Sequence, residues 1–143
     1  MATTVTNTVD ITADPDDVWA VLADLPATRD WLPGVLAARM DGDVRVCTMA
    51  DGQEIHERIG LSPERRSYRF EHLRVPLPVR HSHGTFTVTA GTQAGTVRVT
   101  LETTFDPADP AATEAVTEMI DGAFGQALES LRRFVEEKVT WDA

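Results

Sequence analysis

The fold is decided at residues 9–17, which read Val-Asp-Ile-Thr-Ala-Asp-Pro-Asp-Asp. Up to residue 12 the chain alternates between apolar and polar side chains, which is typical of a half-buried strand. Asp14 and Pro15 then form a helix start, because an aspartate can cap free backbone N–H groups and a proline suits the first helical position. One face of this strand is formed by Val5, Asn7, Val9 and Ile11.

Two short helical pieces follow, and they end before Pro33-Gly34. Residues 35–105 then contain six segments of strand length, separated by turn signals such as Asp41-Gly42 and Asp51-Gly52. Short links of this kind favour an antiparallel meander, because parallel strands need long crossovers. From Asp109-Pro110 onward, apolar residues recur at helical spacing over about 25 residues. We therefore expect an α+β fold in which one long C-terminal helix packs on a sheet.

The size and the charge of the chain limit the classes of function that can be expected. The 143 residues fit a single domain, 1–143, and the net charge of -10 without a basic run makes nucleic acid and membrane insertion poor expectations. No signal peptide or spanning segment is evident, so a cytoplasmic protein is expected, and a homodimer is left open. Twelve arginines against one lysine suggest a GC-rich bacterial genome. The one cysteine, Cys47, is expected to be structural.

Strand alternation identifies one unusual charged residue. The inner face of the 53–61 strand should carry Ile55, Glu57, Ile59 and Leu61. A carboxylate on an apolar face is costly, and one that holds its proton near neutral pH can act as a general acid or base. The alternative is a structural pairing of Glu57 with Arg45 or Arg74, or an edge position in contact with water.

The same parity places other polar groups on the inner face. His72 shares its face with Tyr68 and Phe70, and is either a proton shuttle or a satisfied core histidine. His81 and His83 lie on the outer face without a third ligand at a suitable spacing, so no metal is expected. The inner faces of the later strands are predicted to carry Ser82, Gly84, Phe86 and Val88, and then Val97, Val99, Leu101, Thr103 and Phe105.

The order of the predicted strands and helices, with the turn and cap residues between them, resembles that of the START/Bet v 1-like (SRPBCC) superfamily. Within this superfamily it resembles the bacterial polyketide cyclase/dehydrase and lipid-transport group. The resemblance is carried by residues 9–15, Val18-Trp19, Asp24, Trp31-Leu32-Pro33, 55–59, 66–70, 76–79 and 125–131. It implies a helix-grip fold, in which a seven-stranded antiparallel sheet curves around the C-terminal helix and encloses an apolar cavity. It does not imply one chemistry, because members include aromatase/cyclases, lipid and hormone binders and stress-response proteins.

These observations lead to a functional expectation with an alternative. We expect a cavity for a hydrophobic, polyketide-like or polycyclic molecule, with cyclisation or dehydration by acid–base chemistry and without a cofactor. The alternative is binding, transport or sequestration without chemistry, and a protein-binding role is weaker. The expected catalytic residues are Glu57, His72 and Tyr68. The expected ligand-binding residues are Asn7, Phe70, Ser82, Phe86, Leu101, Thr103, Met119 and Ala123. The loop Pro76-Leu77-Pro78 is either a lid over the cavity or a simple turn.

Overall fold

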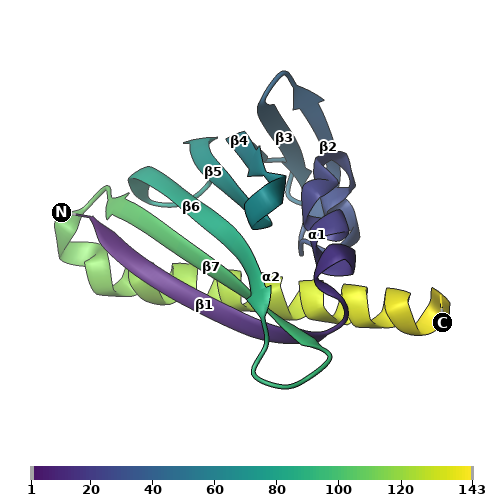
Figure 1. The fold of residues 1–143 in the computed structure, drawn as a ribbon. Coiled ribbons are helices and arrows are strands. Elements are labelled where there is room, and N and C mark those ends of the chain that lie inside the picture. Colours follow the sequence, from purple (N-terminus) through teal and green to yellow (C-terminus); the bar gives the residue numbers. More distant parts are fainter. Residues whose placement is uncertain (1, 143) are drawn as a thin grey trace.

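The computed structural model describes residues 2–142, with side chains as far as residue 138, so the two ends of the expected 1–143 domain lie outside the described residues. Seven strands form one antiparallel sheet in the order β1-β7-β6-β5-β4-β3-β2 (Figure 1). This confirms the predicted fold class. The strands are β1 (Thr3–Thr12), β2 (Val35–Asp41), β3 (Val44–Met49), β4 (Glu54–Ser62), β5 (Ser67–Arg74), β6 (Val79–Ala90) and β7 (Thr96–Pro107).

The helices lie where the caps and prolines predict them. They are α1 (Pro15–Ala23), the 3-10 helices η1 (Leu25–Asp30), η2 (Pro63–Arg65) and η3 (Pro110–Ala112), and the long α2 (Thr113–Asp142). The expected side-chain cap at Asp14 is wrong: its carboxylate makes no capping hydrogen bond, and its backbone carbonyl closes the first turn by accepting from Asp17 and Val18. At Asp109 the side chain does cap, accepting from the Ala111 N–H at 3.0 Å.

The sheet curves around α2, which runs along its inner face beside β1 and β7 (Figure 1). Apolar side chains on this face and on α2 form the main core, including Ile11, Val99, Leu101, Leu128 and Leu131, each at most 1% exposed. The alternation predicted for β5, β6 and β7 is confirmed by the burial of their inner faces. A long helix with one apolar stripe therefore buries that stripe against the only sheet available.

Leu61 lies on the predicted face, opposite the inward Tyr68, but it is not buried. Its parity matches that of the buried Glu57 and Ile59, yet Leu61 is 44% exposed. It lies one residue before β4 ends at Ser62 and turns into η2. Alternation predicts the side of the sheet, and the extent of the covering layer decides whether that side is buried.

Gly84 allows an aromatic ring to lie flat across the sheet. It is the cross-strand neighbour of Phe70, and a Cβ at Gly84 would lie 2.8 Å from Phe70 Cε1 and 2.7 Å from the Glu102 carbonyl oxygen. We expect Gly84→Ala to lower the free energy of unfolding by about 1–3 kcal/mol, the usual cost of overpacking. Chemical denaturation measures this, with Gly60→Ala as the control because nothing lies within 4 Å of a Cβ there. Equal stability of the two variants would contradict the prediction.

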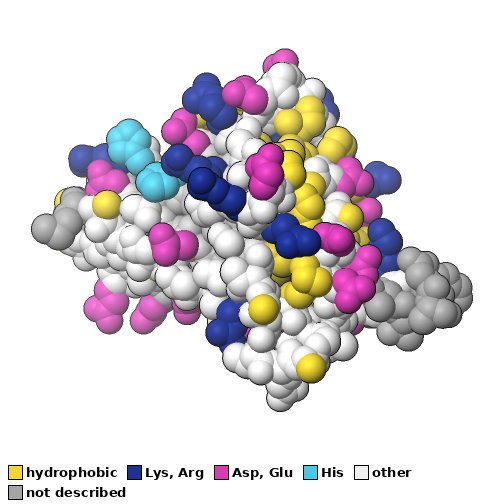
Figure 2. Space-filling view, in the orientation of Figure 1, with side chains coloured by type: hydrophobic (Ala, Val, Ile, Leu, Met, Phe, Trp, Pro, Cys, Tyr) yellow, Lys and Arg dark blue, Asp and Glu magenta, His cyan; other side chains and the backbone are white. Residues whose placement is uncertain are grey.

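Within residues 2–142, no helix combines the length and apolar character needed to cross a membrane. Charged side chains of both signs are spread over the face of the molecule seen in Figure 2, with hydrophobic side chains gathered between them.

Candidate functional site

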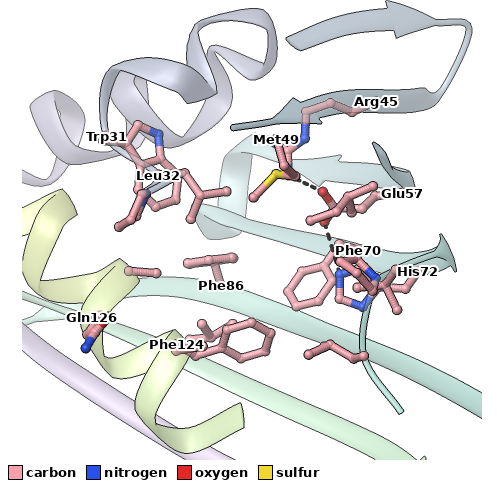
Figure 3. Close-up of a pocket in the computed structure, with 18 of the residues that line it drawn as sticks. Trp31, Leu32, Arg45, Met49, Glu57, Phe70, His72, Phe86, Phe124 and Gln126 are labelled. Atoms are coloured by element: carbon pink, nitrogen blue, oxygen red, sulfur yellow. Dashed lines mark hydrogen bonds and ion pairs between the residues drawn. The ribbon is translucent and has the colours of Figure 1, made fainter. Parts of the chain in front are cut away.

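A cavity of about 320 Å³ lies between the inner face of the sheet, the segment after η1 and α2. Its volume is at the lower end of the range for small-molecule sites, roughly 300–1,000 Å³. Val75, Pro76 and Leu77 from the β5–β6 loop also line it, so this loop lies against the cavity. Most of the lining is aromatic or aliphatic, with Trp31, Leu32, Phe70, Phe86, Phe124 and Ala127 among its members (Figure 3).

Aromatic rings make up most of one wall. Tyr68 stacks on Phe86 with ring centroids 4.7 Å apart, and Trp31 meets Phe86 edge-on at 6.1 Å. Phe124 of α2 meets Phe70 edge-on at 6.4 Å. Edge-to-face and offset arrangements of this kind are the preferred geometries of aromatic pairs. The wall therefore presents ring faces and edges to the cavity.

A row of polar side chains crosses the sheet beside these rings, and its His72 ring lies 5.1 Å from that of Phe70. Arg45 of β3 lies directly opposite Glu57 of β4, and Glu57 lies opposite His72 of β5. The side chain of His72 then reaches Ser82 of β6. Direct cross-strand neighbours on one face have their Cβ atoms about 4.5–5.5 Å apart, so strand register alone brings these groups together. Figure 3 shows Arg45, Glu57 and His72 in this order.

Arg45 and Glu57 form a buried ion pair. Arg45 Nη2 lies 3.1 Å from Glu57 Oε1, and the two side chains are only 3% and 8% exposed. Arg45 Nη1 donates to Thr28 Oγ1 at 2.7 Å, and Thr28 in turn donates to the Leu25 carbonyl of η1. This confirms Arg45 as the structural partner considered for Glu57. The pair compensates the buried charge and leaves Glu57 Oε2 directed toward His72.

His72 has a polar partner at each ring nitrogen. Nδ1 lies 2.5 Å from Ser82 Oγ, and Nε2 lies 3.6 Å from Glu57 Oε2, with the side chain 7% exposed. Burial lowers the pKa of His72 below its usual value, against the opposing pull of the Glu57 carboxylate. Burial also raises the pKa of Tyr68. Near neutral pH, His72 is therefore an uncharged imidazole and Tyr68 an intact phenol, and both can donate a hydrogen bond.

Comparison with known proteins agrees with this architecture. A family model described as polyketide cyclase / dehydrase and lipid transport matches residues 2–136. The chain belongs to this family. No curated protein matches the sequence.

Solved structures share the fold of this polyketide cyclase/dehydrase family member along almost its whole length. A protein from Bacillus thuringiensis superposes with a TM-score of 0.83 at 26% identity, covering 92% of this chain and 97% of the other. The protein XoxI from Bacillus cereus gives 0.83 at 27% identity, covering 94% and 97%. The Zhui aromatase/cyclase from Streptomyces sp. R1128 gives 0.74 at 21% identity, covering 96% and 93%, which is evidence for the fold alone.

The cavity of this family member collects most of the residues expected from alternation. Those that line it are Glu57, Tyr68, Phe70, His72, Phe86, Leu101 and Ala123. Four expected ligand-binding residues lie outside its lining: Asn7, Ser82, Thr103 and Met119. The catalytic and binding roles of the lining residues stay predictions.

The four outlying residues have other surroundings. Asn7 Nδ2 donates to the Asp121 carboxylate at 2.8 Å and thereby ties β1 to α2. Ser82 contacts His72 at Nδ1, and it lines a smaller recess of about 230 Å³. Thr103 is fully buried in the sheet. The inward position expected for Met119 is wrong: it is 49% exposed, because it precedes the buried Ile120 by one residue and so lies about 100° away around the helix.

Twelve of the lining residues were not among the expected site residues, and Trp31, Phe124 and Arg45 belong to this group. Trp31 and Phe124 line the cavity, and Arg45 supplies the positive charge beside Glu57. Phe124 belongs to the apolar stripe of α2, so helical periodicity was the available signal for it. Arg45 has the same strand parity as Cys47 and as Met49, which also lines the cavity. That parity, together with the need of an inward Glu57 for a counter-ion, was the sequence signal for an inward arginine.

The remaining reactive side chains have structural positions. Cys47 is fully buried, and burial raises the pKa of its thiol to about 11, which disfavours the reactive thiolate. His81 and His83 are exposed on the outer face of β6. Within the described part of the chain, no group of three or more His, Cys, Asp or Glu side chains is arranged to hold a metal ion.

The neutral state of His72 predicts a pH dependence of stability. Unfolded His72 takes up a proton at its ordinary pKa of 6.5, whereas burial lowers its pKa in the folded protein. Between these values the unfolded state binds more protons, so the free energy of unfolding falls as the pH drops below about 6.5. We expect His72→Gln to flatten this slope in denaturation midpoints measured from about pH 8 to pH 5. His81→Gln is the control on an exposed histidine, and an unchanged slope in His72→Gln would contradict the prediction.

Proposed function

We propose that this protein binds a hydrophobic, polyketide-like or polycyclic molecule in its cavity and catalyses its cyclisation and dehydration without a cofactor. The observation that carries the proposal is the placement of Glu57 and His72 in the wall of a mostly apolar cavity. Membership of a family of polyketide cyclases and dehydrases supports the reaction class. An enclosed, mostly apolar space with a few polar groups is the usual form of a site that orients a hydrophobic substrate.

The first contribution of the cavity is to fold a flexible chain. Holding two reacting carbons in contact replaces an encounter in solution with an intramolecular step, which supplies several kcal/mol of the barrier reduction. The ring faces of Phe70, Phe86 and Trp31 supply flat surfaces for the forming rings. The size of the cavity limits how much of a chain can coil inside it.

The polar row then supplies the proton transfers. Glu57 Oε2 removes a proton from a carbon between two carbonyl groups, and the resulting enolate carbon bonds to a distant carbonyl carbon. The electron pair of that carbonyl moves to its oxygen, which accepts a hydrogen bond from His72 or Tyr68 and takes a proton back from Glu57. Loss of this hydroxyl with a proton from the adjacent carbon releases one water and leaves a double bond.

The test is product formation by the purified protein. A panel of linear poly-β-carbonyl compounds and polycyclic compounds is incubated with the protein and analysed by mass spectrometry. We expect a product 18 mass units lighter than a linear substrate, the mass of one water, formed faster than in protein-free buffer. Recovery of every bound compound unchanged would reject catalysis.

Binding without chemistry is the second candidate function. It is favoured by the ion pair itself, because Arg45 gives Glu57 a structural partner and so a reason to be buried that does not require catalysis. The family description also includes lipid transport. Compounds that bind in the cavity and are recovered intact would support this function.

A further inference from the structure

The Glu57–His72 contact leaves room for one atom of a ligand. The two facing atoms, Glu57 Oε2 and His72 Nε2, are 3.6 Å apart, which is too long for a direct hydrogen bond. Both side chains line the cavity. A ligand oxygen placed about 2.8 Å from each atom would complete a triangle and satisfy both.

The charge of Glu57 determines what this oxygen must do toward the carboxylate. Glu57 Oε1 lies 3.1 Å from the permanently charged Arg45, which favours the ionised form of the carboxylate. An ionised carboxylate only accepts hydrogen bonds. The group facing Oε2 must therefore donate.

Ser82 determines which ring nitrogen of His72 carries the proton. A bare Nε2 would place its lone pair against the Glu57 carboxylate, so we assign the proton to Nε2 and the lone pair to Nδ1. The Ser82 hydroxyl then donates to Nδ1 across 2.5 Å. This arrangement makes His72 Nε2 a donor toward the cavity, and the group facing it must accept.

The structure thus assigns a chemical class to the ligand: we propose that the cavity takes an uncharged aromatic molecule whose hydroxyl group bridges Glu57 Oε2 and His72 Nε2, with Ser82 as the positioning residue. A hydroxyl both donates and accepts, whereas a ketone or ether only accepts. A carboxylate would face the charge of Glu57, and the charge of Arg45, a lining cation, is already compensated by Glu57. The inference rests on the proposed binding cavity and does not require turnover.

Three probes of the same ring system separate the ligand classes. Calorimetric titration of the whole chain with 2-naphthol, 2-methoxynaphthalene and 2-naphthoate is expected to show 2-naphthol binding at least about tenfold more tightly than either of the others. His72→Phe should bring the ratio of naphthol to methoxynaphthalene affinity close to one. Equal affinities in the unaltered protein, tighter naphthoate binding, or no detectable binding of 2-naphthol would each overturn the proposal.

A second measurement tests whether Ser82 fixes the tautomer of His72 in the ligand-free protein. Nitrogen-15 chemical shifts of His72 are expected to show the Nε2–H form, and Ser82→Ala should produce a mixture of tautomers and reduce the naphthol preference several-fold. Ser82→Thr keeps the hydroxyl and should restore both properties. Thr85→Ala, on the opposite face of the same strand, is the matched control. An Nδ1–H form in the unaltered protein would overturn the assignment whatever the turnover, whereas a hydroxyl preference without any product would reject only the catalytic proposal.

Discussion

Arg45→Met is expected to lower the free energy of unfolding by about 3–5 kcal/mol, because it leaves the buried Glu57 carboxylate without its counter-ion. Methionine fills much of the volume of the arginine stem, so most of the loss reflects the unpaired charge. The hydrogen bond from Arg45 to Thr28 is lost as well, which loosens the attachment of η1 to β3. Urea denaturation followed by fluorescence of the tryptophans measures the change.

The chain contains a matched pair for comparison. Arg58 and Glu71 also lie opposite each other on neighbouring strands, with the same 3.1 Å separation between nitrogen and oxygen, but their side chains are 53% and 56% exposed. Water screens this pair, so Arg58→Met should cost less than about 1 kcal/mol. Residue types, strand pairing and distance are the same, so the two pairs differ mainly in burial and in their third partners, Thr28 for Arg45 and Asp43 for Arg58.

The double variant Arg45→Met, Glu57→Leu sharpens the test. Replacing both charges with apolar groups removes the desolvation cost of each charge. We therefore expect the double variant to recover most of the stability that is lost in Arg45→Met. A double variant as unstable as the single one would show that the loss comes from packing or from the Thr28 contact. A loss in Arg45→Met no larger than that in Arg58→Met would contradict the expected role of the pair.

The sequence was sufficient to predict the sides of the strands and the order of the elements. A period of two fixes which side chains share a face, and this placed Glu57, Tyr68 and His72 together before any pairing was known. The limits of the rule appear at element ends and on the long helix. Leu61 and Met119 have apolar side chains, but the layer that would cover them stops short or lies on another side of the helix.

The partner of Glu57 could not be chosen from sequence because it depends on strand register. Arg45 and Arg74 were both acceptable, and the sheet pairs Arg74 with His56 and Arg45 with Glu57. Unbroken pairing from Ser62 with Ser67 to Glu57 with His72 places the histidine opposite the carboxylate, and the shift beyond Glu57 moves only His56, which lies opposite Arg74. Such a bulge depends on local turn and packing geometry and is not encoded by alternation. The polar row is thus a product of register.

Glu57→Gln is expected to retain binding of an apolar ligand that lacks a hydroxyl group and to lower turnover at least tenfold, since a general acid or base usually contributes roughly 10²–10⁴-fold. The amide has the shape of the carboxylate, and its oxygen can still accept from Arg45 Nη2, but it cannot take up a proton at neutral pH. Turnover is measured by product formation and binding by calorimetry, under conditions where the variant is folded. The expected pattern is a lower kcat with little change in affinity for an apolar ligand.

Glu54→Gln is the control, because Glu54 lies on the same strand, pairs with His56 at 3.1 Å and lines no part of the cavity. It should leave turnover unchanged. If Glu57→Gln turned over substrate as fast as the unaltered protein, Glu57 would have no part in proton transfer, and its burial would be explained by the Arg45 pair alone. If affinity fell while kcat stayed unchanged, the carboxylate would act mainly in holding the ligand, since a loss of binding common to the ground and transition states raises KM without an effect on kcat.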